Sequence, residues 1–212
     1  MNYNLKDIEK NPWLIEKVDN QYEELCILCV KKAWNTLKLI KKPTEKVIEN
    51  AVKTKGWAIQ YVKNPSEKVS LKAIETDWDS IRYIKNPSLK VMIKSVQLNW
   101  EAIKYLDNPP FEVKKIAAEK NEESVMYLDN ISDDEKKQFI KANIKVLKYI
   151  KFEDYSTIKD ILIDKLNSNE VERQYVVDFL EIRAIKMDKI KFIHKYGSKE
   201  AKMYTVDYKL SR

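Results

Sequence analysis

Few residues of this chain have types and spacing that could do chemistry. Cys26-Ile-Leu-Cys29 is a single C-x-x-C motif, and such motifs supply zinc ligands or redox-active thiols in other proteins. A zinc site needs two further ligands, and the lone histidine, His194, lies far away in the sequence. Because both cysteines fall inside the apolar stretch Leu25 to Val30, we expect buried structural thiols, kept reduced as in a cytoplasmic protein.

The other candidates for acid–base chemistry also have structural interpretations. His194 lies near the end of a predicted helix and is expected to be a surface or capping residue. Asp77 stands where a helix cap is expected, and Asp79 stands at a position expected to face solvent. Two glycines in 212 residues are too few for a phosphate-binding loop or a nucleophile elbow. We therefore predict no enzymatic activity, no metal site and no cofactor.

Tyrosines and basic residues that recur along the chain are stronger candidates for a binding site. The tyrosine column consists of Tyr61, Tyr83, Tyr105, Tyr127 and Tyr149. The basic stripe beside it consists of Lys38, Lys41, Lys63, Arg82, Lys85, Lys104, Lys148 and Lys151. Such residues could follow a phosphate backbone while bases stack on the rings, although Asp107 and Asp129 interrupt the stripe. The alternative is that the rings stack on one another at the edge of a core.

The regular spacing of these residues comes from an internal repeat. Lys63-Asn64-Pro65 recurs as Lys85-Asn86-Pro87 and then, in changed form, as Asp107-Asn108-Pro109, with a step of 22 residues. Cutting at these points gives six blocks without a gap: 22–43, 44–65, 66–87, 88–109, 110–131 and 132–153. A partial seventh copy precedes them, and repetition without insertions is typical of solenoid proteins.

Each block, numbered from 1 to 22, predicts two short helices. The first has apolar residues at positions 4, 8 and 9 and starts at a capping residue, as in Thr44, Ser66, Ser88 and Ser132. The second has apolar residues at positions 13, 16 and 19 and starts at Asp77, Asn99, Asn121 or Asn143. Asn-Pro at positions 21 and 22 ends it. Helices this short are unstable alone, so we predict an all-α solenoid of six to seven stacked two-helix repeats.

The repeat fades after residue 153, which predicts a solenoid over 1–153 and a helical cap over 154–212. Apolar clusters in the cap predict three helices, around Ile158 to Leu166, Val176 to Leu180 and Ile185 to Ile193. Thr205 to Leu210 alternates apolar and polar residues, which suggests a short strand or a loose end. Between 182 and 212, nine basic residues stand against three acidic ones, so this end could meet an acidic protein or nucleic acid.

The segment Lys55-Gly-Trp-Ala-Ile-Gln-Tyr-Val-Lys-Asn-Pro-Ser-Glu-Lys-Val69 resembles the unit of an uncharacterised repeat family. That family repeats G-W-A-L-x-Y-V-K-x-P-S/T-E-x-V in bacteria, phages and giant viruses. The similarity is close over 44–109, weaker over 22–43 and 110–153, and absent from the cap. The resemblance implies a helical repeat without a known reaction, and a bacterial or mobile-element origin.

Solenoids present extended surfaces, so we predict a non-enzymatic protein-binding module. The distribution of the similar family suggests one form of it, a phage- or mobile-element-encoded inhibitor of a bacterial host protein such as an immunity component. The alternative is a nucleic-acid-binding protein that uses the basic stripe, or an inhibitor that occupies a nucleic-acid channel. No signal peptide or membrane-spanning run is recognisable, which favours a cytoplasmic location without membrane contact.

Overall fold

A computed structural model describes residues 3–151 and 155–211. Within these residues every regular element is an α-helix or a 3₁₀ helix, and none is a strand. The predicted all-α fold is therefore confirmed. The chain divides into two compact units, residues 1–109 (unit 1) and 110–212 (unit 2). The predicted boundary at 153/154 falls among residues 152–154, which lie outside the described part.

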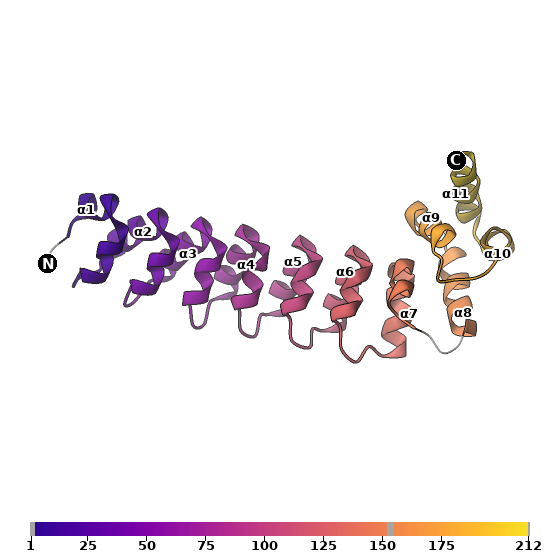
Figure 1. The fold of residues 1–212 in the computed structure, drawn as a ribbon, viewed down its shortest axis with the longest axis horizontal. Helices are drawn as coiled ribbons and strands as arrows, with labels where there is room; N and C mark the ends of the chain where they lie inside the picture. The colour runs from indigo at the N-terminus through magenta and orange to yellow at the C-terminus, as the bar shows by residue number, and fades with distance from the viewer. Residues whose placement is uncertain (1–2, 152–154, 212) are drawn as a thin grey trace. The chain divides into compact units, whose positions relative to one another are not determined.

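Unit 1 consists of stacked repeats, each with one α-helix and one 3₁₀ helix. The α-helices are α1 (Leu5–Lys10), α2 (Glu23–Lys32), α3 (Glu45–Thr54), α4 (Glu67–Thr76) and α5 (Leu89–Leu98). The 3₁₀ helices are η1 (Pro12–Lys17), η2 (Trp34–Leu39), η3 (Gly56–Tyr61), η4 (Trp78–Tyr83) and η5 (Trp100–Tyr105). Within unit 1, consecutive α-helices contact one another and so do consecutive 3₁₀ helices, and α1 to α5 stand side by side in chain order (Figure 1). This is the predicted solenoid, including the partial copy at its start.

The α-helices begin where the capping residues predicted them. The side chains of Thr44, Ser66 and Ser88 accept hydrogen bonds from the backbone N–H groups three residues later. The same hydroxyls donate to a glutamate of the preceding repeat, for example Ser66 Oγ to Glu45 Oε1 at 2.7 Å. Each cap thus satisfies its own helix and joins it to the previous one. The capping role was readable from sequence, whereas the link between repeats was not.

The second helix of each repeat is a 3₁₀ helix and not the predicted α-helix. In the 66–87 repeat, Ser80 N–H bonds to the Asp77 carbonyl at 2.9 Å, and Ile84 N–H bonds to the Ile81 carbonyl at 3.0 Å. An α-helix of six residues would leave most of its backbone groups without intrahelical partners, whereas 3₁₀ bonds close one residue sooner. The strict three-residue spacing of positions 13, 16 and 19 is the sequence signal for this geometry.

The predicted caps of the second helices are confirmed except in one repeat. The side chains of Asn99, Asn121 and Asn143 each accept the backbone N–H two residues later. Asp77 makes no such bond, because its carboxylate reaches back to the preceding repeat. The turns that follow use asparagine in the left-handed region, with positive φ at Asn86, Asn108 and Asn130.

The core lies between the two helical layers and includes three columns of the repeat. Position 9 is at most 1% exposed in every block: Val30, Val52, Ile74, Val96, Ala118 and Ile140. Position 16 is also buried throughout: Leu37, Ile59, Ile81, Ile103, Val125 and Leu147. A third buried column, position 15, carries only small or short side chains: Thr36, Ala58, Ser80, Ala102, Ser124 and Val146.

Unit 2 continues the repeats and ends in the predicted helical cap. Its repeats contain α6 (Phe111–Lys120), η6 (Glu122–Tyr127), α7 (Asp133–Ala142) and η7 (Ile144–Lys148). Four cap helices follow: α8 (Tyr155–Leu166), α9 (Arg173–Glu181), α10 (Lys189–Tyr196) and α11 (Lys199–Leu210). In the cap, α8 packs on α7, and α9 packs on η7. The end of the last repeat is covered in this way.

Two details of the cap differ from the prediction. Thr205 to Leu210 belongs to α11 and is neither strand nor loose end, because Ala201 and Thr205 are buried where α11 packs on α9 and α10. The helix predicted around Ile185 begins only at Lys189, where Asp188 accepts the Lys191 N–H as an N-cap. Ile185 is nevertheless buried, which explains why it completed the apolar pattern.

Candidate functional site

The C-x-x-C motif is a buried structural pair within unit 1. Both cysteines are free and buried, and they lie on α2. Cys29 Sγ donates to the Pro12 carbonyl at 2.8 Å, and Cys26 Sγ donates to the Gln21 carbonyl at 3.5 Å. Burial raises the pKa of Cys26 to about 11 and also raises that of Cys29. Since the thiolate is the nucleophile and the metal ligand, this pair is poorly suited to redox or metal chemistry.

We therefore expect both thiols to be unreactive in the folded protein. Near pH 8, a disulfide reagent should modify native protein at least about tenfold more slowly than urea-unfolded protein, because few thiolates form at a raised pKa. The absorbance of the released chromophore measures both rates. Equal rates in the native and unfolded states would contradict the burial of this pair.

The other candidates for acid–base chemistry are dispersed over the fold. His194 is exposed in the last turn of α10, as expected. The prediction that Asp79 faces solvent is wrong. Its side chain is only 18% exposed, and it accepts the Trp57 indole N–H at 2.7 Å. No group of three or more His, Cys, Asp or Glu residues within 3–151 and 155–211 is arranged to hold a metal ion.

The predicted basic stripe and tyrosine column are divided between the two units. Unit 1 carries Lys38, Lys41, Lys63, Arg82, Lys85 and Lys104, together with Tyr61, Tyr83 and Tyr105. Unit 2 carries Lys148 and Lys151, together with Tyr127 and Tyr149. All eight basic residues are exposed, whereas Tyr61 and Tyr83 are half-buried.

Several cations of the stripe are paired with acids on their own surface. Arg82 lies 3.0 Å from Asp79, and Lys104 lies 2.5 Å from Glu101. In unit 2, Lys148 contacts Glu122 at 2.7 Å. The acids of the first two pairs occupy position 14, three residues before the cation. These pairs lower the net positive charge that the stripe offers to a ligand.

The tyrosines of unit 1 contact residues of the preceding repeat. Tyr61 stacks on Trp34 with ring centres 6.2 Å apart, and Tyr83 meets Trp57 edge-on at the same distance. The guanidinium of Arg82 lies 4.6 Å from the ring centre of Tyr105 and donates to its hydroxyl at 2.9 Å. These contacts with tryptophan and arginine replace the expected tyrosine-on-tyrosine stacking, so the column joins consecutive repeats.

One groove in unit 1 brings three of the predicted site residues together. It has a volume of about 460 Å³ and lies between the 66–87 and 88–109 repeats, where Arg82, Lys85 and Tyr105 line it. We call it the Tyr105 groove. Asp107 adds an acid to its wall, and Ile84, Met92 and Leu106 add apolar surface. Sequence reasoning treated Asp107 only as an interruption of the stripe, because the repeat pattern does not show which side chains share a groove.

Comparison with known proteins does not assign a function to this site. No protein family, curated protein or solved structure matches the chain. Within the described residues, no helix combines the length and apolar character that crossing a bilayer requires.

Proposed function

We propose that this chain is a non-enzymatic protein-binding module that holds a peptide segment of its partner in the Tyr105 groove. The observation that carries this proposal is the mixed lining of the groove. Lys85 and Asp107 offer charges of opposite sign, Tyr105 offers an amphipathic ring that is 39% exposed, and Leu106 adds a largely buried apolar side chain to the lining. A peptide presents charged, polar and apolar groups close together, and such a lining complements all three.

The geometry favours a peptide over a nucleic acid at this groove. A phosphate backbone would be attracted by unpaired cations and repelled by carboxylates. Arg82, however, already pairs with Asp79 and lies against the Tyr105 ring, so one ring face is occupied. Asp107 adds a negative charge to the groove wall. An inhibitor of a bacterial host protein, the form suggested by the distribution of the family that residues 44–109 resemble, would be one such module.

Nucleic-acid binding is retained as a second candidate because of a specific feature of unit 1. Lys41, Lys63 and Lys85 follow the 3₁₀ helices at intervals of one repeat, and all three are exposed. None of their side chains forms an ion pair with another described residue of the chain. If they bind a phosphate backbone, affinity should fall steeply with added salt and should be similar for unrelated sequences.

Capture from extracts of the native host, quantified by mass spectrometry, tests the proposed function. We expect a partner bound by the wild type to be lost with Lys85→Glu combined with Tyr105→Ala. It should be kept with Lys63→Glu, which reverses the equivalent lysine of the preceding repeat. Binding should survive nuclease treatment. A partner lost equally with both variants, or released by nuclease, would overturn the Tyr105 groove as the protein-binding site.

A further inference from the structure

The helical cap of unit 2 contains a second groove, which shares no residue with the Tyr105 groove or the basic stripe. It has a volume of about 590 Å³ and lies where the segment between α9 and α10 meets α11. We call it the cap groove. Its basic lining residues include Arg183, Lys186 and Lys209, and its apolar ones include Ile185 and Ile190.

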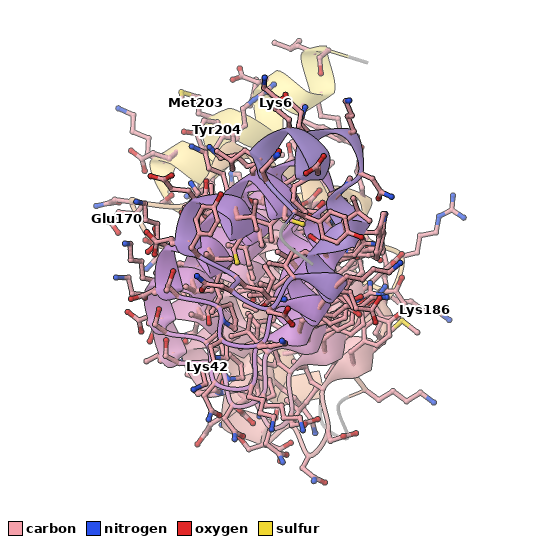
Figure 2. The ribbon with its side chains drawn as sticks, turned by 90° about the vertical axis from the view of Figure 1, so that its left-hand side faces the viewer. Lys6, Lys42, Glu170, Lys186, Met203 and Tyr204 are labelled. Carbon is pink, nitrogen blue, oxygen red and sulfur yellow. The ribbon has the colours of Figure 1, made fainter. Side chains whose placement is uncertain are left out.

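Three cations of the cap groove are available to a ligand. Arg183, Lys186 and Lys209 are exposed, and none forms an ion pair with a described residue. Figure 2 shows Lys186 projecting from the ribbon. Arg82 and Lys104 of the unit 1 stripe, by contrast, each pair with an acid.

The acidic groups at the cap groove are already engaged within the protein. Asp188 accepts the Lys191 backbone N–H at 3.0 Å and lies 3.4 Å from its ammonium group. Glu181 accepts the Tyr208 hydroxyl at 3.2 Å. Among the described lining residues, the basic side chains Arg183, Lys186, Lys189 and Lys209 outnumber these two carboxylates, so the net charge of the groove is positive, which agrees with the basic excess of residues 182–212.

Buried contacts fix the shape of this groove. Lys189 is half-buried, and its ammonium group donates to the carbonyls of Leu180 and Ile182 at the end of α9. This ties the start of α10 to the end of α9, and it leaves Lys189 with a structural role. Ile185 is buried beneath the segment, while Ile190 is 42% exposed and provides apolar surface that a ligand can cover.

We propose that the cap groove binds an acidic peptide segment with an apolar side chain among its carboxylates. The carboxylates would face Arg183, Lys186 and Lys209, and the apolar side chain would cover Ile190. Charge complementarity and exposed apolar surface are both needed to select such a peptide. A nucleic acid fits less well, because Tyr208 is the one ring among the described lining residues and its hydroxyl is held by Glu181.

Fluorescence anisotropy with the full-length chain tests the proposal. The probe is a short labelled peptide in which glutamates surround two leucines, and the comparison probe replaces each glutamate with lysine. We expect saturable binding of the acidic probe only, weakening as salt is added. Reversing Arg183, Lys186 and Lys209 to glutamate should weaken binding by about tenfold or more. Ile190→Ser should weaken it to a smaller extent.

The matched control reverses the same amount of charge outside the groove, through Lys195→Glu, Lys199→Glu and Lys202→Glu. Circular dichroism of both triple variants should show the helical spectrum of the wild type. An equal loss of affinity in the two variants would show attraction by overall charge and would overturn the proposal. Tighter binding of a single-stranded oligonucleotide of equal charge at the same three residues would also overturn it. Because every substitution lies in unit 2, these outcomes are separate from those for the Tyr105 groove.

Discussion

Replacing Gly56 with alanine should lower the free energy of unfolding by about 3 kcal/mol, the upper end of typical overpacking costs. A Cβ atom at this position would lie 2.3 Å from the Ala73 carbonyl oxygen and 2.5 Å from Ser80 Oγ. The carbonyl belongs to α4, and it also accepts bonds from Asp77 N–H and the Ser80 hydroxyl. It cannot move away without weakening them. Urea unfolding followed by circular dichroism measures the loss.

The repeat pattern alone would recommend the opposite change at this position. Trp34, Trp78 and Trp100 occupy the equivalent place in other blocks, so averaging over repeats suggests tryptophan for Gly56. The structure predicts that Gly56→Trp is even more destabilising than Gly56→Ala. Gln60→Ala, an exposed change in the same 3₁₀ helix, is the control and should stay within about 0.5 kcal/mol of wild type. A wild-type unfolding midpoint for Gly56→Ala would contradict the close approach of the repeats.

Replacing Asp77 with alanine should cost about 2 kcal/mol, because it leaves a buried backbone donor without its charged acceptor. The Asp77 carboxylate accepts the Gly56 N–H at 2.6 Å and the Lys55 ammonium at 2.6 Å, and its side chain is 19% exposed. Both donors belong to the preceding repeat. Thermal and urea unfolding of the variant should show the loss.

Lys55→Met separates the two interactions of Asp77. The Lys55 side chain is 38% exposed, so loss of this ion pair alone should cost less than about 1 kcal/mol. Asp77→Asn keeps an acceptor for the Gly56 N–H and should fall between the two variants. If Lys55→Met is as destabilising as Asp77→Ala, the ion pair is the main contribution and our assignment of the backbone bond is wrong.

The two predictions concern the same physical feature, the contact between consecutive repeats. The short helices cannot be stable alone, so each repeat depends on its neighbours. Some of that dependence is apolar, through the buried columns at positions 9 and 16. The rest is polar and specific, as in the bond from Ser66 to Glu45 and those from Lys55 and Gly56 to Asp77. Substitutions at these points test the stacking more directly than core truncations do.

The repeat pattern predicted some features of the site and missed others. Arg82, Lys85 and Tyr105 were predicted from columns of the repeat, and the structure places all three in one groove. The pairing of Arg82 with Asp79 was not predicted, because position 14 appeared to be a solvent-exposed site of an α-helix. The cap groove was not predicted as a pocket either. Only the basic excess of 182–212 indicated that this end could meet an acidic partner.

The sequence by itself determined what depends on local periodicity: the 22-residue repeat, the helix starts at Ser66 and its equivalents, and the buried columns. These features follow from the types and spacing of side chains along one short segment, and both can be read from the sequence. The tertiary structure alone decided the partners of Asp77, the need for glycine at 56 and the lining of both grooves. Those depend on contacts between residues about one repeat apart or more, and repeat stacking and cap folding bring such residues together.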